Sequence, residues 1–173
     1  MKRLELFIIG ATLLAALVWM TLFCAVVFFR SEPIPESVCG RRVEKAFRAE
    51  VVRIVDGDTI ELAGFDKTFR FASVDTPEPD QPFGPEAGDA IAYLVGEVVQ
   101  VYQVQVGRWG RPVAFFELDG VNINADQVRR GLAWHDTRYS SDEQLETMEN
   151  DARNEGRGLW QQPDPIAPWD WRN

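Results

Sequence analysis

The sequence predicts an α+β fold, in which a small antiparallel β-barrel carries helices and follows one transmembrane helix. The expected elements run in the order three strands, one helix, two strands and two helices. Short strands joined by short connections are typical of small barrels and not of parallel α/β sheets. The transmembrane helix is predicted by residues 6–29, a run of 24 residues without a charged side chain.

The uncharged run is long enough to cross a bilayer, since about 20 apolar residues suffice. A cleavable signal peptide has an apolar core of about 7–15 residues and a small-residue cleavage site, and this run fits neither condition. We expect residues 1–30 to be an uncleaved, single-pass anchor in the cell (inner) membrane. Lys2 and Arg3 favour a cytoplasmic N-terminus and an extracytoplasmic (periplasmic) domain, although the arginines and lysine after the run oppose this orientation.

Residues 31–46 mix proline, serine and charges, and are expected to form a juxtamembrane linker. The predicted folded domain spans residues 47–160. It begins with strand-type alternation in FRAEVVRIVD, DTIELAG and KTFRFASVD, which end at residue 75. AGFDK (63–67) is expected to be a hairpin loop between the last two of these strands.

The rest of the domain alternates between helix and strand patterns. A helix with Pro85 at its first position is expected over residues 84–97, and strands over 98–106 and 111–120. Two more helices are expected near the C-terminal end of the domain. One begins at Asn124, with Gln127 completing a capping box. The other is capped by Ser141 and Gln144, covers residues 141–156, and buries Leu145, Met148 and Ala152 while its acidic residues face solvent. Residues 161–173 form a Pro/Trp-rich arm to which we assign no chemistry.

Composition excludes several classes of function. The formal net charge is −9, so a protein that binds nucleic acid by overall charge alone is excluded. His135 is the only histidine, which argues against a Ser-His-Asp triad or a His-rich zinc site and favours a structural role. Cys39 is the only thiol outside the predicted anchor, so it has no partner for an intrachain disulfide there. It is expected to be a linker residue, and an intermolecular bridge stays open.

The remaining reactive groups are carboxylates and guanidinium groups. Asp56 and Asp58 flank a glycine in a stretch that is also a plain hairpin turn. Asp75 and Glu78 come at the end of a predicted strand, and carboxylates at loop ends suit Ca²⁺ or Mg²⁺. Arginines match phosphate oxygens, so the set fits metal-assisted phosphodiester chemistry. Arg70 and Asp75 are five residues apart, and a continuous strand would place them on opposite faces unless a bulge intervenes.

Five motifs in order closely resemble the thermonuclease family, whose type member is staphylococcal nuclease. They are DGDTIEL (56–62), RFASVDTPE (70–78), FGPEA (83–87), GRPVAF (110–115) and VRRGLAW (128–134). The resemblance covers roughly residues 48–160. It implies a five-stranded OB-fold β-barrel with three helices, in agreement with the order of elements above.

The resemblance also implies roles by position. The implied cofactor is Ca²⁺, and the implied metal ligands are Asp58, Asp75 and the Thr76 carbonyl, with Asp56 in support. The implied catalytic residues are Glu78 as general base and Arg70 and Arg111 as phosphate-binding groups. Trp109 and Tyr139 match nucleotide-binding aromatic residues, and ordinary packing stays open for both.

The resemblance therefore predicts a Ca²⁺-dependent nuclease that hydrolyses DNA and/or RNA, leaves 3′-phosphate ends, and has no obligate protein partner. One alternative is a catalytically weak nucleic-acid-binding OB module tethered to the membrane. Another is a tethered envelope protein with a structural calcium ion. A binding-only domain would not need Arg70, Glu78 and Arg111 beside the metal carboxylates, so their presence favours catalysis.

Overall fold

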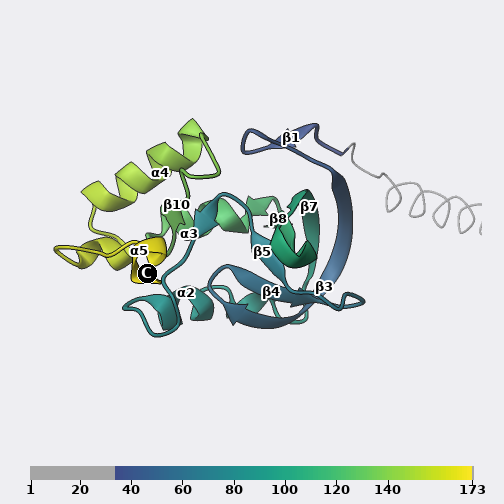
Figure 1. Cartoon of the computed structure of the whole chain (residues 1–173), viewed down its shortest axis with the longest axis horizontal. Helices are drawn as coiled ribbons and strands as arrows, with labels where there is room; N and C mark the ends of the chain where they lie inside the picture. Colours follow the sequence, from purple (N-terminus) through teal and green to yellow (C-terminus); the bar gives the residue numbers. More distant parts are fainter. Residues whose placement is uncertain (1–33, 173) are drawn as a thin grey trace, which may run out of the picture. The chain divides into compact units, whose positions relative to one another are not determined.

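Residues 34–172 are described in the computed structural model of the chain, shown in Figure 1. The predicted anchor at residues 1–30 lies outside the described residues. Within residues 34–172, no helix combines the length and apolar character needed to cross a membrane. The features below belong to one compact unit, Pro35–Asn173.

Five strands close a β-barrel, as the sequence predicts. They are β3 (Lys45–Asp56), β4 (Thr59–Leu62), β5 (Phe69–Phe71), β7 (Val98–Val106) and β8 (Pro112–Leu118). Neighbours in the order β5-β4-β3-β7-β8 pair antiparallel. A parallel pairing of β5 with β8 joins the two edges. The short strand β9 (Val121–Asn122) pairs antiparallel with the end of β8.

The barrel interior follows from the period-2 alternation of its strands. Alternate residues of β5, Phe69 and Phe71, are buried in the core, and Phe71 packs against Phe116 of β8 with ring centroids 4.7 Å apart. Arg70 lies between the two buried phenylalanines and therefore points away from the barrel interior.

The expected continuous strand over residues 67–75 is wrong, because the chain bends at Ser73. β5 ends at Phe71, and a separate strand β6 (Val74–Asp75) pairs antiparallel with β10 (Trp134–His135). Ser73 has φ 64°, a left-handed conformation that no regular strand contains. The sequence predicts opposite faces for Arg70 and Asp75 unless the strand is interrupted, and the bend at Ser73 is such an interruption, so the two side chains contact each other.

The helix expected over residues 84–97 is shorter in the structure. α2 covers Gly84–Asp89, and a 3₁₀ turn, η1, covers Ala92–Leu94. The Val51 N–H donates to the Glu97 carbonyl, and the Gly96 N–H donates to the Val51 carbonyl, at 2.9 and 2.8 Å. These bonds hold residues 96–97 against β3, so the tertiary pairing ends the helix early.

Both later helices form, but their caps differ from the prediction by one or two residues. α3 (Ile123–Arg129) is capped by Asn122, which accepts the Ala125 N–H at 3.1 Å. α4 (Glu143–Asn154) is capped by Asp142, which accepts two N–H groups at 2.9 Å. Asn124 and Ser141 are therefore not the caps. The predicted buried stripe of α4 is confirmed, except that the acidic residue Glu149 is also buried.

The flanking segments contain more structure than the sequence suggests. Within the predicted linker, β1 (Ser37–Val38) and β2 (Arg41–Arg42) pair as a small hairpin. In the Pro/Trp-rich region, η3 (Gly158–Gln161) and α5 (Pro168–Trp171) form short helices. Figure 1 shows α5 on the same side of the barrel as α2 and α4. The ring of Trp134 contacts Trp160 and Trp169, with centroids 4.4 and 5.6 Å away.

Candidate active site

Asp58 lies in the tight turn between β3 and β4, and its side chain is fully buried. Its Oδ2 accepts the backbone N–H of Thr76 at 2.8 Å, and its Oδ1 accepts Nη1–H of Arg70 and the hydroxyl of Thr59. Its own N–H donates to Asp56 Oδ1 at 3.1 Å, which closes the turn. Asp56 therefore supports the turn, and Asp58 faces into the protein.

Two contacts fix the position of this turn. A Cβ added to Gly57 would lie 2.6 Å from Ala87 Cβ, so only glycine lets the turn approach α2 this closely. Gln127 of α3 donates from Nε2 to the carbonyls of Gly57 and Ala87, both at 2.9 Å. The sequence predicts that Gln127 is part of a capping box, and this prediction is wrong, because its side chain is only 1% exposed and bonds to other elements. Its side chain instead ties the Asp58 turn to α2 and α3.

Asp75 is brought beside Asp58 by the bend at Ser73. Its side chain is fully buried, and Arg70 donates from Nη2 to Asp75 Oδ1 while its Nη1 binds Asp58. The planar fork of one guanidinium thus bridges the two carboxylates that the sequence assigns as metal ligands. The register supports this arrangement, because Arg70 pairs with Thr59, the neighbour of Asp58.

Arg111 immediately precedes β8 and reaches the same end of the barrel. Its Nη2 donates to Thr59 Oγ1 at 2.6 Å, and its Nε–H is buried without a hydrogen-bond partner. Burial, followed by the charge of Arg70, holds the pKa of Arg111 below its usual value. A partly buried guanidinium with a buried, unused Nε–H is suited to an anion, because a buried polar group without a partner costs free energy.

Glu78 lies at the rim of this site, in the loop between β6 and α2. Its N–H donates to Gln81 Oε1 at 3.1 Å. A Cβ at Gly84 would overlap the Glu78 carbonyl oxygen, so the glycine of the FGPEA motif is required for the loop to fold back here. The Glu78 side chain is 28% exposed and forms an ion pair with Arg172.

Two arginines that the sequence did not single out complete the site. Arg138 donates to Asp75 Oδ2 at 3.0 Å and to both oxygens of Asp136. Arg172 donates to both oxygens of Asp75 and to Glu78. Both residues are distant from Asp75 in sequence, and no local motif marks them.

The buried carboxylates are suited to a hard cation. Burial, together with the charges of Asp56 and Asp75, raises the pKa of Asp58 to about 7, although Arg70 and the Thr76 N–H oppose the shift. A divalent ion beside Asp58 and Asp75 would stabilise their ionised forms, which burial disfavours. Carboxylate oxygens are also the ligands that Ca²⁺ and Mg²⁺ prefer. No group of three or more His, Cys, Asp or Glu side chains within residues 34–172 is arranged to hold a metal. A cation here would rest on two carboxylates, backbone oxygen and water.

Comparison with known proteins identifies the family. A family model described as staphylococcal nuclease homologue matches residues 68–162. The chain belongs to the staphylococcal nuclease family. An uncharacterized endonuclease of Escherichia coli O157:H7 is 40% identical over 127 residues, which cover 71% of this chain and 83% of that protein. A micrococcal nuclease of Shigella flexneri is 39% identical over 140 residues, or 73% and 80% of the two chains.

The relatives include eukaryotic proteins. A staphylococcal-like nuclease of Arabidopsis thaliana is 30% identical over 131 residues, which cover 75% of this chain and 41% of that protein. The part of this chain that matches the staphylococcal nuclease family model contains Arg70, Asp75, Glu78 and Arg111, whereas Asp58 lies before it.

The two aromatic residues predicted to bind nucleotides lie on the surface of this family member. Trp109 is 94% exposed and Tyr139 is 67% exposed, so ordinary core packing does not account for them. Trp109 has φ 62°, and Lys67 Nζ donates to its carbonyl at 2.8 Å, which fixes the backbone that presents the ring. Arg41 likewise donates to the Tyr139 carbonyl at 2.9 Å.

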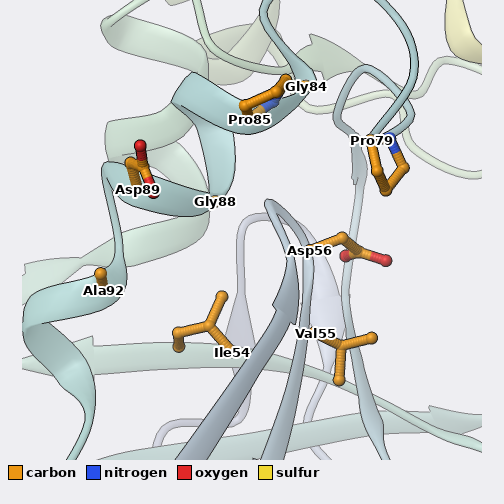
Figure 2. Close-up of a pocket in the computed structure, with 9 residues that line it drawn as sticks. All are labelled: Ile54, Val55, Asp56, Pro79, Gly84, Pro85, Gly88, Asp89 and Ala92. Atoms are coloured by element: carbon orange, nitrogen blue, oxygen red, sulfur yellow. The ribbon is translucent and has the colours of Figure 1, made fainter.

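An open pocket of about 310 Å³ is lined by residues of β3 and α2, including Asp56 beside the Asp58 turn. Figure 2 shows that Asp56 and Val55 of β3 and Pro85 and Asp89 of α2 contribute to its lining. Its lining is largely apolar and contains no arginine. In this member of the staphylococcal nuclease family, the carboxylate–arginine cluster and not this pocket carries the groups for phosphate chemistry.

In the part of the chain that the structure describes, neither His135 nor Cys39 marks a second reactive centre. His135 is 3% exposed and its backbone N–H donates to Glu149 Oε1 at 3.2 Å. Cys39 is half-buried, and burial followed by the charge of Asp142 raises its pKa to about 11, so it is a poor nucleophile at neutral pH.

Proposed function

We propose that this chain is a Ca²⁺-dependent nuclease that hydrolyses phosphodiester bonds of DNA and/or RNA and leaves 3′-phosphate ends. The observation that carries the proposal is the Arg70 guanidinium bridging two fully buried carboxylates, Asp58 and Asp75. Family membership and the names of its relatives, which include nucleases of bacteria and plants, support the same activity.

The division of labour follows from the contacts of each residue. Asp58, Asp75 and the Thr76 carbonyl would hold the cation, which when bound would supply positive charge to the phosphate. Arg111 has a buried N–H without a partner, which suits a phosphate oxygen. Arg70 donates hydrogen bonds to both carboxylates and so holds them in position. Glu78 is 28% exposed and is linked to the cluster through Arg172, which suits a group that takes a proton from water.

The test is a cleavage assay on single-stranded DNA and RNA with Ca²⁺ or with a chelator. Glu78→Ser and Arg111→Ala should each lower the cleavage rate by about 100-fold or more, since each removes a proposed transition-state contact. Arg129→Ala is the matched control, because Arg129 pairs with Asp126 on the exposed face of α3. Labelling of product ends should detect 3′-phosphates. Cleavage that ignores both calcium and the two substitutions would overturn the proposal.

The alternative of a binding-only OB module gives a different result in the same assay. It predicts retention of single-stranded DNA on a gel without new ends, with or without calcium. The formal net charge of −9 disfavours it, because binding by charge alone requires a basic surface.

We also propose that the domain is anchored in the cell membrane and faces away from the cytoplasm. The support is the 24-residue uncharged run at residues 6–29 with Lys2 and Arg3 before it. A reporter that is active only outside the cytoplasm, fused after Asn173, should be active in cells. An inactive reporter together with an active cytoplasmic one would reverse the orientation.

A further inference from the structure

Asp75 accepts hydrogen bonds from three different arginines. Its Oδ1 accepts Nη2–H of Arg70 and Nη1–H of Arg172, the latter at 3.3 Å. Its Oδ2 accepts Nη2–H of Arg138 at 3.0 Å and Nη2–H of Arg172 at 2.6 Å. An ionised carboxylate has about four lone-pair positions, so these four contacts fill them. A cation can bind Asp75 only if one of the arginines leaves.

The three arginines differ in how firmly other groups hold them. Arg70 also binds the fully buried Asp58, and its side chain is 23% exposed. The Arg138 side chain makes two further hydrogen bonds to Asp136, and its guanidinium carbon lies 4.4 Å from the ring centroid of Trp169. Arg172 and Arg138 are both 40% exposed, but within residues 34–172 the side-chain hydrogen bonds of Arg172 go to Asp75 and Glu78 alone, so no group outside the site holds its guanidinium. Arg172 is therefore the arginine that a cation displaces at least cost.

The segment before Arg172 is docked on the loop that carries Glu78. Gln81 Nε2 donates to the Ile166 carbonyl at 2.6 Å, and Trp171 Nε1 donates to Asp80 Oδ1 at 3.2 Å. Arg172 is the C-cap of α5, so this helix delivers its guanidinium to the site. The contact reaches both a proposed metal ligand, Asp75, and the proposed general base, Glu78.

We propose that Arg172 is an autoinhibitory residue, whose guanidinium occupies the cation position at Asp75 and pairs with Glu78 in the metal-free protein. Calcium binding and the Arg172 contact are mutually exclusive, so Arg172 sets the calcium concentration at which the site fills. Displacement of Arg172 also frees Glu78. The inference rests on the proposed function, because it takes Asp75 as a cation ligand and Glu78 as the base.

The direct test is calorimetric titration of CaCl₂ into the full chain without nucleic acid. Arg172→Ala should bind calcium about three- to tenfold more tightly than the wild type, since a partly exposed charged contact no longer competes. Arg172→Lys keeps the charge but lacks the fork that spans Asp75 and Glu78, so its affinity should lie between the two. Arg129→Ala removes the same charge from an exposed pair on α3 and should bind calcium as the wild type does.

An Arg172→Ala chain that binds calcium as tightly as the wild type, or less tightly, overturns the inference. So does a failure of every variant to bind calcium. Thermal unfolding of each variant shows whether it is folded.

A cleavage assay on the same samples separates the two proposals. Tighter calcium binding by Arg172→Ala without any cleavage retains the autoinhibitory contact and overturns the nuclease, whereas calcium-dependent cleavage with unchanged affinity does the reverse.

Discussion

The inner and outer halves of the candidate site are built in different ways. In the inner half, Asp58 and Asp75 are fully buried and are held by Arg70 and by a backbone N–H. In the outer half, Glu78 is 28% exposed and Arg172 is 40% exposed, and side chains alone connect them. The difference indicates that the inner half is part of the folded core, whereas the outer half can rearrange when a ligand arrives.

The largest expected effect is the loss of Arg70. Arg70→Ala leaves two buried carboxylates without their shared partner, and breaking a buried ion pair costs about 3–5 kcal/mol of unfolding free energy. Arg172→Ala, in the outer half, should change the unfolding free energy by no more than about 1 kcal/mol. Urea unfolding of both variants in chelator measures the contrast. Equal losses would show that the two halves do not differ in the way their exposure suggests.

The second prediction concerns the support of the inner half. Gln127→Met keeps the length of the side chain but removes the donors to the Gly57 and Ala87 carbonyls. A buried carbonyl left without a donor costs about 1–3 kcal/mol, and the costs of two neighbouring groups do not add fully, so the variant should lose about 2–4 kcal/mol of stability. Its calcium affinity should also fall, because the turn that carries Asp58 is no longer fixed.

A matched control separates this effect from the general cost of losing a glutamine. Gln144→Met, on the exposed face of α4, makes the same chemical change where no buried carbonyl depends on it. It should unfold at the same urea concentration as the wild type. If Gln127→Met also unfolds there, its hydrogen bonds do not hold the inner half together.

The inner half was largely predictable from sequence, and the outer half was not. Asp58 and Arg70 lie in two short motifs that meet where β4 pairs with β5, so strand pairing brings them close. The contact with Asp75 depends on the left-handed backbone at Ser73, which no residue pattern predicts. Arg172 is 97 residues from Asp75, and only tertiary packing determines that α5 ends there.

Local patterns also misassigned two residues of the structure. Asn124 and Gln127 satisfy a capping-box pattern, but Asn122 caps the helix and both predicted residues are buried. Asn124 binds the carbonyls of Ala72 and Ala114 and the N–H of Phe116, at the seam where β5 meets β8. The capping-box pattern describes only the helix and not its neighbours. It therefore cannot distinguish a surface cap from a buried amide that bonds to the backbone of distant strands.

The third prediction uses the raised pKa of Asp58. The pKa of Asp58 is about 7 in the folded protein and 3.8 in its reference state. Between about pH 4 and pH 7, the native state therefore keeps a proton on Asp58 that the unfolded state has already released. Stability from this group is complete below about pH 4 and is lost as pH rises through 7, with a slope of about 1.4 kcal/mol per pH unit. Urea unfolding in chelator at pH 5, 6 and 7 measures it.

Calcium should reverse this dependence. A cation binds the ionised carboxylate, so calcium affinity should fall up to about tenfold per pH unit below pH 7, and saturating calcium should remove the loss of stability at higher pH. Asp58→Asn removes the titrating group and should flatten the slope in chelator. A wild-type slope that persists in Asp58→Asn would assign it to another residue.

The smallest expected effect lies farthest from the core. Trp109→Ala removes a ring that is 94% exposed, so the unfolding free energy should stay unchanged within error. If the ring stacks on a base, affinity for single-stranded DNA should fall by about 1 kcal/mol, or about fivefold, at the low end for such contacts. Fluorescence anisotropy of labelled DNA with Glu78→Ser chains, with and without Trp109→Ala, measures binding without cleavage. Val121→Ala, on another exposed site, is the control. Equal affinities for all three chains would confine nucleic-acid recognition to the arginines of the site.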